Sequence, residues 1–483
     1  MSPSQVKDKA ATVVGGARSG RAAARLLAGA GADVFLTEHG EATRGLEEAL
    51  REAGIQYEFG EHTRRALEAD FFVVSPGVPS SAPIVRQARR GGLAVYSEIE
   101  AASWFCEAPV VAITGTNGKT TTTSLAGHFF RQHVQQKESS DGGEVIVAGN
   151  IGYPFSDYVA EATPQDVVAL EVSSFQLDHI DTFRPRVAAL LNVTPDHLDR
   201  YDNNFNDYAQ SKFRLFENQR EDDVLVYNHD DNLVRGFVEK VARRRGLKAL
   251  AFSTQAEVEE GAFIDDEGRI IFRIHGQEEP LMLADERAPS LRGQHNLQNT
   301  LAAAISARIM EVRSEILRES LTTFEGVPHR LELVRTTSAA GVPSGNGPSG
   351  NGPGAQGVRW VNDSKATNVN AVWYALESFD APVVLIAGGR DKGNDYSAIK
   401  PLLREKARAV IALGESADTV MRELGAEGPE SERVATMEEA TRAAQRLARD
   451  GDVVLLSPAC SSFDMYENYE ERGDTFRRLV LNL

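Results

Sequence analysis

Hydrophobic and polar residues follow one another along this chain in short blocks whose period switches between that of a strand and that of a helix. The apolar runs Ala11–Val14 and Phe71–Val74 predict buried strands, and Arg21–Ala30 predicts a helix after a Gly-rich turn. Ser75–Pro79 contains two prolines and one glycine, so it predicts a rigid turn that continues neither element. The first block therefore predicts a small α/β unit of the nucleotide-binding type.

The middle of the chain carries apolar runs that are continuous, with no polar residue at alternate positions. Such runs predict parallel strands whose two faces are both covered by helices. A helix predicted over Gln294–Met310 precedes the end of this block. The apolar runs are Pro109–Ile113, Val167–Leu170, Val187–Leu191 and Val224–Tyr227.

The last block begins with two strand-like runs, Arg330–Val334 and Val358–Val361, on either side of a tract at 336–357 that is rich in Gly, Ser and Pro. The tract holds two copies of Ser-Gly-Asn-Gly-Pro and has almost no apolar surface to offset its ordering entropy. It therefore predicts a disordered loop that extends a hairpin. Another parallel sheet is predicted from Val383–Ala387, Ala409–Leu413 and Val453–Leu456.

The length supports this division, because 483 residues at about 150 residues per domain correspond to about three domains. We predict an α/β protein with domains at 1–107, 108–327 and 328–483. The first is predicted to be Rossmann-like, the second to hold a parallel sheet of the P-loop ATPase type, and the third to be Rossmann-like again.

Charge and cysteine content narrow the function classes. Asp plus Glu number 70 and Lys plus Arg number 52, a net charge of −18, which argues against a coat for nucleic acid or for an anionic membrane. Only Cys106 and Cys460 occur, so neither a disulfide framework nor a thiolate zinc site is expected, and a reducing cytoplasm fits. Met1–Lys9 has no apolar core, and no run approaches the roughly 18 residues that a membrane span needs. We expect no signal peptide and no membrane partner.

The strongest local signal is a phosphate loop. A buried strand leads into Gly115-Thr-Asn-Gly-Lys-Thr120 and then into a predicted helix. Glycines let backbone N–H groups approach phosphate oxygens, Lys119 can reach the β- and γ-phosphates, and Thr120 offers a hydroxyl to Mg²⁺. Ile113 stands where the usual pattern begins with glycine, so the strand–loop–helix context carries the assignment. The chain has no Asn-Lys-x-Asp tetrad, which argues against a regulatory GTPase.

Three further residues are candidates for a magnesium site. Glu171 follows the strand Val167–Leu170, and a carboxylate at that end of a strand beside a phosphate loop suits Mg²⁺. His197 follows another strand, and Lys212 lies on a predicted helix. Taken singly, each of the three is more typical of a solvated surface residue.

The motifs taken in order resemble the Mur ligases of peptidoglycan synthesis, and the resemblance covers essentially the whole chain. Within that family they are most similar to the member that adds D-glutamate to UDP-N-acetylmuramoyl-L-alanine. The diaminopimelate- or lysine-adding member's Asp-Asn-Pro-Arg motif is absent. The motifs include Thr114–Thr120, Leu170–Leu177, Asn192–Tyr201, Ser211–Arg214, Gly293–Asn299, Asn362–Asn368, Leu456–Asp464 and Glu471–Phe476.

The resemblance implies an ATP-dependent acid–D-amino-acid ligase of class EC 6.3.2, which works through an acyl-phosphate and releases ADP and phosphate. It implies roles in cell wall biogenesis, cell shape, cell division and the cell cycle. Lys119, His197 and Lys212 would be catalytic, and two Mg²⁺ ions would be held by Thr120, Glu171, His197 and a carbamylated Lys212. ATP would contact Gly115, Thr116, Asn117, Gly118, Lys119, Thr120, Thr121, Asn296, Asn299, Arg330 and Asp363.

The same resemblance implies the other two substrate sites. We expect a cytoplasmic monomer, with the sugar nucleotide, D-glutamate and ATP as its only partners. UDP-N-acetylmuramoyl-L-alanine would contact Ser19, Glu38, Ser75, Gly77, Asn150 and Gln176. D-glutamate would contact Lys365, Thr367, Lys392, Ser462 and Tyr469, the last at a position where the family often has Phe.

Other functions remain open from the sequence. The nearest are another amide ligase of the superfamily, either the L-alanine-adding Mur enzyme or folylpolyglutamate synthase. The folate enzyme lacks a uridine-binding first domain, so residues 1–105 argue against it. A P-loop motor would leave the motifs of the last block unexplained, and an NAD-dependent oxidoreductase would rest on the weak glycine pattern Gly15–Gly20 alone.

Overall fold

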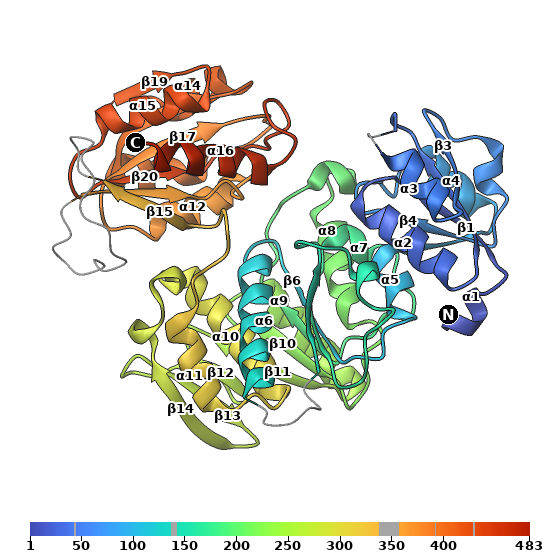
Figure 1. Ribbon diagram of the computed structural model, residues 1–483. Coiled ribbons are helices and arrows are strands. Elements are labelled where there is room, and N and C mark those ends of the chain that lie inside the picture. Colours follow the sequence, from blue (N-terminus) through green and yellow to red (C-terminus); the bar gives the residue numbers. More distant parts are fainter. Residues whose placement is uncertain (43–44, 137–142, 338–356, 392, 428–429) are drawn as a thin grey trace. The chain divides into compact units, whose positions relative to one another are not determined.

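The computed structural model describes residues 1–42, 45–136, 143–337, 357–391, 393–427 and 430–483. Three sheets follow one another along the chain, coloured from blue to red in Figure 1. The chain forms two compact units: residues 1–286 with 297–322, and residues 287–296 with 323–483. The predicted α/β fold class is confirmed. Each predicted domain span contains one of the sheets, and the exact domain limits stay a prediction.

The first sheet has five parallel strands in the order β3-β2-β1-β4-β5. Alternate residues of each strand face opposite sides of the sheet. Val13 and Val73 pack with α2, α3 and α5, whereas Val14 and Phe72 pack with α4 on the other face. The elements are β1 (Ala10–Val14), β2 (Asp33–Glu38), β3 (Gln56–Phe59), β4 (Phe71–Val74), β5 (Ala94–Ser97), α1 (Pro3–Val6), α2 (Arg18–Gly29), α3 (Leu46–Glu52), α4 (Pro83–Arg90) and α5 (Glu98–Ser103).

The second sheet has nine strands in the order β14-β13-β12-β11-β10-β9-β6-β8-β7. It is parallel from β7 to β12, and β13 and β14 add an antiparallel edge. Its strands are β6 (Val110–Thr114), β7 (Val145–Gly149), β8 (Val167–Glu171), β9 (Val187–Leu190), β10 (Val224–Asn228), β11 (Lys248–Ser253), β12 (Gly261–Ile264), β13 (Arg269–Ile274) and β14 (Gln277–Leu283). Its helices are α6 (Lys119–Gln135), α7 (Ser174–Leu177), α8 (Phe205–Phe213), α9 (Asn232–Arg245), α10 (Gln294–Ile309) and α11 (Ser314–Thr323).

The third sheet has six strands in the order β15-β16-β20-β17-β18-β19. Leu385 and Leu455 face α12, α13 and α14, whereas Ile386 and Leu456 face α15 and α16, so alternate residues of each strand reach opposite helix layers. The elements are β15 (Glu332–Thr337), β16 (Val358–Asn362), β17 (Val383–Gly388), β18 (Ala407–Leu413), β19 (Glu430–Arg433), β20 (Val453–Leu456), α12 (Val369–Glu377), α13 (Lys400–Lys406), α14 (Ala417–Leu424), α15 (Met437–Leu447) and α16 (Tyr469–Leu481).

The predicted hairpin is confirmed, because β15 and β16 pair antiparallel. The predicted start of the loop at 336 is wrong. Thr336 and Thr337 still belong to β15, where they pair with Arg359 and Val358. Of the rest of that tract, residues 338–356 lie outside the described residues, and Gly357 directly precedes β16. Within the described part of the chain, no helix has the length and apolar content that crossing a membrane requires.

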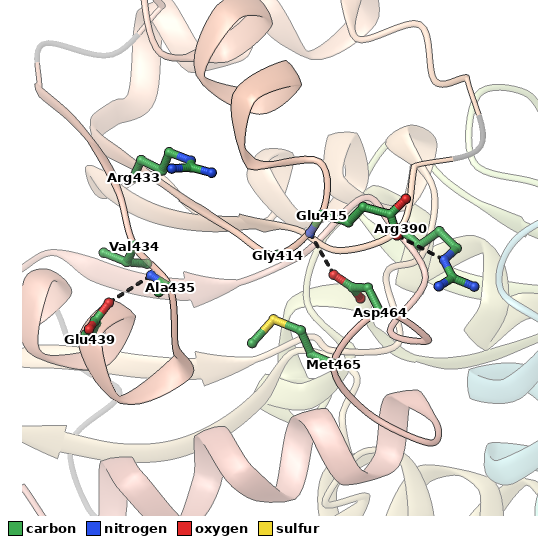
Figure 2. Close-up of a pocket in the computed structure, with 9 residues that line it drawn as sticks. All are labelled: Arg390, Gly414, Glu415, Arg433, Val434, Ala435, Glu439, Asp464 and Met465. Atoms are coloured by element: carbon green, nitrogen blue, oxygen red, sulfur yellow. Dashed lines mark hydrogen bonds and ion pairs between the residues drawn. The ribbon is translucent and has the colours of Figure 1, made fainter.

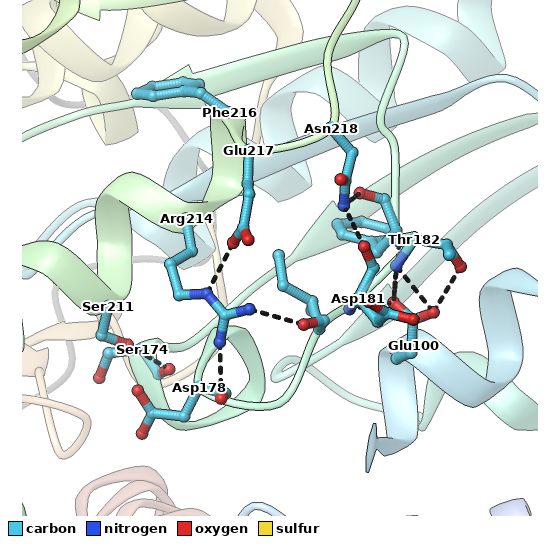
Figure 3. Close-up of polar contacts among 12 residues, drawn as sticks. Glu100, Ser174, Asp178, Asp181, Thr182, Ser211, Arg214, Phe216, Glu217 and Asn218 are labelled. Carbon is cyan, nitrogen blue, oxygen red and sulfur yellow. Dashed lines mark hydrogen bonds and ion pairs between the residues drawn. The ribbon is translucent and has the colours of Figure 1, made fainter. Parts of the chain in front are cut away.

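Two buried glutamates of α5 join the first sheet's layer to the second. Glu100 accepts hydrogen bonds from the backbone N–H groups of Asp181, Thr182 and Phe183 at 2.8–3.0 Å (Figure 3). Glu98 accepts from the backbone N–H and the hydroxyl of Ser156, both at 2.7 Å. Its other oxygen, Oε2, is buried and has no hydrogen-bond partner among the described residues. Burial raises the pKa of the Glu98 carboxyl to about 7.

The raised pKa of Glu98 predicts a pH-dependent stability. The folded state binds the Glu98 proton more tightly than the unfolded chain, whose pKa is near 4.5. Stability from this group is therefore full below about pH 4.5 and is lost as the pH rises through about 7. The quantity to measure is the melting temperature of the wild type minus that of Glu98→Gln, obtained by calorimetry. We expect this difference to be larger at about pH 5 than at about pH 8.

The exposed carboxyl of Glu107 provides the matched control. Glu107→Gln should leave the difference from wild type nearly constant over the same pH range. An equally constant difference for Glu98→Gln would contradict the assignment of a raised pKa to Glu98.

Candidate nucleotide and magnesium site

The phosphate loop lies between β6 and the N-terminus of α6, where the sequence predicts it. Gly118 has φ 85°, a left-handed conformation that favours glycine, and it directly precedes the first residue of α6. A Cβ added at Gly118 would lie 2.2 Å from Oδ1 of Asn299. The loop thus turns tightly into the helix while its backbone N–H groups stay at the positive end of the helix dipole.

The segment that follows β9 supports the loop from beside it. The side-chain oxygen of Asn192 accepts from the N–H of Asn117 at 2.9 Å, and its amide donates to the Asn117 carbonyl at 3.1 Å. The Thr116 hydroxyl lies 3.0 Å both from the Thr194 carbonyl, to which it donates, and from the Tyr208 hydroxyl. These contacts fix the loop's backbone before any ligand binds.

Two lysines converge on one carbonyl oxygen of the loop. Lys119 Nζ donates to the Gly115 carbonyl at 2.9 Å and to the Thr116 carbonyl at 2.8 Å. Lys212 Nζ donates to the same Gly115 carbonyl at 2.8 Å and lies 4.8 Å from the centre of the Tyr208 ring. Lys212 is only 2% exposed. Burial lowers its pKa well below the usual range, and the charge of Lys119 lowers the pKa further.

The helix that carries Lys212 is fastened on both sides of that residue, as Figure 3 shows. Ser211 donates to the Ser174 carbonyl at 2.7 Å. Arg214 donates to the carbonyls of Asp178 and Ile180, both at 2.6 Å. Because α8 is held against α7 in this way, the Lys212 ammonium is directed to the phosphate loop and not to solvent.

Glu171 lies at the end of β8, next to the loop-bearing strand β6, and is 1% exposed. Its Oε1 accepts from the Asn150 side-chain amide at 2.8 Å. Its Oε2 is buried and has no hydrogen-bond partner in the described part of the chain. A buried carboxylate oxygen without a partner is costly, and a divalent cation would satisfy it.

His197 adopts a left-handed backbone conformation with φ 51°, and its ring packs edge-on against Phe175 at 5.3 Å between centroids. Its side chain is 38% exposed. Among the described residues, no three His, Cys, Asp or Glu side chains lie together as a metal site. The residues fit a Mg²⁺ ion that takes only part of its oxygen ligands from this chain and the rest from phosphate or water.

The two predicted adenine contacts lie on α10. Asn299 borders the phosphate loop, as its position against Gly118 shows. Asn296 belongs to the other compact unit, where its side-chain amide donates to the Arg292 carbonyl at 3.0 Å. Thr120 and Thr121 are buried in the first turn of α6.

The predicted sugar-nucleotide residues gather at the carboxyl ends of strands in the first and second sheets. Ser75 follows β4, and its hydroxyl donates to the Gly15 carbonyl at 3.1 Å; Ser19 is in the first turn of α2. Glu38 ends β2 and accepts from the N–H groups of Gly16 and Gly40 at 2.6 and 2.9 Å. Gly77 is exposed on the turn after β4. Gln176 is buried in a capping box with Ser173 at the start of α7.

The third sheet brings together the remaining candidates. Arg330 lies 3.3 Å from the buried Asp363 carboxylate. Burial raises the pKa of Asp363, and the charge of Arg330 offsets part of that rise. Lys365 Nζ lies 5.1 Å from the centre of the Tyr469 ring. Ser462 is buried, and Thr367 lies two residues beyond Lys365. Lys392, the remaining predicted D-glutamate contact, lies outside the described residues.

A cavity of about 630 Å³ opens beside the carboxyl ends of β17, β18 and β19 (Figure 2). Its wall includes Arg390 and Glu415, which form an ion pair at 3.1 Å, and Asp464, which accepts from the Glu415 N–H at 2.8 Å. Lys365, Thr367, Ser462 and Tyr469 do not line it. This cavity is therefore separate from the described candidates for D-glutamate binding.

Sequence reasoning missed several residues that hold the sites. Asn192 stands within a quoted motif, and its position at the end of a strand beside the loop was a usable signal. Tyr208 precedes Lys212 by four residues and so lies on the same helix face. Arg472 donates to the Ser364 carbonyl at 2.8 Å and to the Cys460 carbonyl at 3.1 Å, and nothing in its sequence context indicates these bonds.

Comparisons with known proteins agree with this geometry. The family models described as "Mur ligase middle domain", "Mur ligase, glutamate ligase domain" and "MurD N-terminal domain" match residues 113–307, 352–460 and 10–83. The chain is 62% identical, over the full length of both, to the UDP-N-acetylmuramoylalanine--D-glutamate ligase of Salinibacter ruber. It is 43% identical, again over the full length of both, to the enzyme of the same name from Chloroherpeton thalassium.

The chain belongs to the Mur ligase family. Solved structures show the same fold at low identity. The UDP-N-acetylmuramate-alanine ligase of Thermotoga maritima aligns with TM-score 0.57 and 18% identity over 98% of this Mur ligase and 99% of that chain. A pseudomurein peptide ligase of Methanothermus fervidus aligns with TM-score 0.55 and 18% identity over 98% and 100%.

The close approach at Gly118 predicts the effect of one added methyl group on this ATP-dependent ligase. Gly118→Ala would place a Cβ against Asn299 and strain a left-handed residue, so the loop would have to move. We expect ATP affinity to fall at least about tenfold, or ~1.4 kcal/mol, by isothermal titration calorimetry.

Gly246→Ala is the matched control, because Gly246 has φ 65° but open space around its Cβ position. It should lower the melting temperature without changing ATP affinity. Unchanged ATP affinity in a folded Gly118→Ala variant would contradict the tight fit of the loop.

Proposed function

We propose that this Mur ligase joins D-glutamate to UDP-N-acetylmuramoyl-L-alanine in peptidoglycan precursor synthesis, with conversion of ATP to ADP and phosphate. Membership of the family makes the protein an ATP-dependent, amide-bond-forming ligase. The name shared by its full-length relatives supports the choice of substrates. The observation that carries the proposal is the convergence of Lys119 and Lys212 on the phosphate loop beside Glu171.

The reaction needs an activated carboxylate, because a carboxylate oxygen is a poor leaving group and phosphate is a good one. The alanyl carboxylate attacks the γ-phosphorus of ATP, and ADP leaves. The amine of D-glutamate then attacks the acyl carbon, loses a proton and expels phosphate. Both substrates and ATP are anionic, so the site must supply positive charge where they meet.

Lys119 supplies part of that charge. Its ammonium rests on the loop's own carbonyls and lies within reach of phosphate oxygens bound at the N-terminus of α6. Thr120 and Glu171 would hold the first Mg²⁺, and His197 and Lys212 a second. Mg²⁺ neutralises charge on the transferred phosphoryl group when bound. The unpartnered oxygen of Glu171 is the feature of this chain that fits such an ion.

Lys212 meets the chemical requirement for carbamylation. Because its pKa is lowered, a fraction of its amine is neutral and can attack the carbon of CO₂. The new N–C bond forms as one C=O π bond of CO₂ opens, and the neutral amine loses one proton to become a carbamate anion; counted from the ammonium form, two protons are released. The anion would relieve the repulsion by Lys119 and offer oxygen atoms to Mg²⁺.

The same proposal assigns residues to each of the substrates. Ser19, Glu38, Ser75, Gly77, Asn150 and Gln176 would contact the sugar nucleotide. Asn296, Asn299, Arg330 and Asp363 would contact ATP, and Lys365, Thr367, Lys392, Ser462 and Tyr469 would contact D-glutamate. We further infer a cytoplasmic monomer; the two cysteines, both free, fit a reducing compartment.

The substrate assignment makes a direct prediction for turnover. Turnover of ATP to ADP and phosphate should require both UDP-N-acetylmuramoyl-L-alanine and D-glutamate, as a coupled assay for ADP would measure. Turnover with L-alanine and UDP-N-acetylmuramate in their place would instead support the L-alanine-adding reaction. Turnover with other amino acids but not with D-glutamate would contradict the proposal.

The carbamate makes a second prediction. Lys212→Ala should lower kcat at least about a hundredfold, or ~2.7 kcal/mol. The site would lose both a magnesium ligand and the negative charge that the carbamate places beside Lys119. Acetate should restore part of the rate by supplying a carboxylate. In the wild type, ¹³C-bicarbonate should give a carbamate signal by NMR that Lys212→Ala lacks.

Lys240→Ala, a change at an exposed lysine of α9, is the matched control and should keep full activity. Lys212→Met keeps most of the side-chain volume and separates a folding defect from a chemical one. Full activity in either Lys212 variant would rule out the carbamate.

A further inference from the structure

The guanidinium of Arg200 contacts the turn Ser75–Pro79, which follows β4 of the first sheet. Its two terminal nitrogens donate to the carbonyls of Pro76, Gly77 and Val78 at 3.1, 3.3 and 3.3 Å. Three consecutive carbonyls of one turn thus accept from a single side chain. The turn lies after β4, and Arg200 lies after β9, so residues far apart in sequence meet here.

The two prolines restrict φ at two positions of the turn, but the turn makes few hydrogen bonds within itself. Pro76 and Pro79 have no N–H, and the Val78 N–H donates within the turn to the Ser75 carbonyl at 3.0 Å. A planar guanidinium presents several N–H donors in a fixed fork, which suits neighbouring carbonyl oxygens. The turn carries Ser75 and Gly77, two of the residues proposed to contact the sugar nucleotide.

The other face of Arg200 is fixed by aromatic packing. Its guanidinium carbon lies 4.2 Å from the centre of the Phe175 ring, and the same ring packs edge-on against His197. The N–H of Arg200 donates to the His197 carbonyl at 3.0 Å. One short segment after β9 therefore carries both the proposed magnesium ligand and the contact to the substrate turn.

We propose that Arg200 is a positioning residue: it holds the turn Ser75–Pro79 in the conformation that binds the sugar nucleotide. This inference rests on the proposed function, because it concerns that function's substrate. Without the guanidinium, the turn samples other conformations. The apparent affinity for the sugar nucleotide then falls in proportion to the fraction of molecules whose turn keeps the binding conformation. Once substrate saturates the enzyme, the turn is ordered and the chemical step is unaffected.

The test is the division of the effect between KM and kcat in Arg200→Met. We expect KM for UDP-N-acetylmuramoyl-L-alanine to rise about tenfold, with kcat and the KM of D-glutamate within about twofold of wild type. Arg200→Lys keeps the charge but donates from a single nitrogen, so its KM should lie between those of wild type and Arg200→Met. Direct titration of the sugar nucleotide without ATP should show the same order of Kd values.

Arg245→Met is the matched control. Arg245 also donates to two backbone carbonyls, those of Phe216 and Gln219, at 2.8 and 2.6 Å, but both lie within the second sheet's layer. Its loss should lower the melting temperature and leave every KM unchanged. The Arg245 variant thus shows what a merely structural arginine does.

Three outcomes separate the claims. An unchanged KM for the sugar nucleotide in folded Arg200→Met or Arg200→Lys would overturn the inference while leaving the proposed function intact. A fall in kcat alone would also overturn it, because it would place Arg200 at the chemical step. Absence of D-glutamate-dependent turnover in the wild type would reject the proposed function itself. If Arg200→Met does not fold, Arg200→Lys alone decides.

Discussion

The site depends on a single carbonyl oxygen that accepts hydrogen bonds from two lysines. The Gly115 carbonyl accepts from Lys119 at 2.9 Å and from Lys212 at 2.8 Å; Lys212 is buried and Lys119 is half-buried. Two ammonium groups so close together repel each other strongly, and burial makes that repulsion more costly. The lowered pKa of Lys212 follows directly from this placement. A phosphate group or a carbamate, each an anion, would remove the conflict, so the same arrangement that strains the protein without its ligand favours binding.

Such strain persists only because the surrounding structure enforces it. Asn192 holds the loop's backbone through both its amide oxygen and its amide nitrogen, and Arg214 ties α8 to the segment beyond α7. Neither residue need touch a substrate. Their hydrogen bonds to backbone groups hold in place the loop and the segment from which the two lysines extend. Positions with an unfavourable local interaction are common at functional sites, and here the supporting contacts can be named.

Much of the fold can be predicted from the sequence because buried parallel strands are continuous apolar runs. Phe71–Val74 and Val453–Leu456 are strands with those same limits. The end of β15 was missed because Thr336 and Thr337 are polar, and only pairing with β16 makes them part of a strand. The phosphate loop was local and therefore visible. Lys212 was identified only through the family resemblance, and Arg200 was missed. Each works through a long-range contact with backbone carbonyls, and a lysine or arginine on a polar segment looks solvated in any sequence pattern.

The net charge of −18 shows why local placement matters more than composition for these ligands. Each proposed substrate is anionic, so the average field of the protein opposes its approach, and at physiological salt that field is screened within about 8 Å. The positive groups proposed to bind these ligands, or to lie beside them, include the lysines at Gly115, the N-terminus of α6, Arg330, Lys365 and the guanidinium of Arg200. The guanidinium of Arg200 donates its hydrogen bonds to the carbonyls of the turn Ser75–Pro79. It therefore orients neutral backbone groups and adds its charge only at short range. The segment that carries Arg200 also carries His197. Any movement of this segment would therefore shift the substrate turn and the proposed magnesium ligand together. The segment, with its left-handed backbone at His197, thus links sugar-nucleotide recognition to phosphate chemistry.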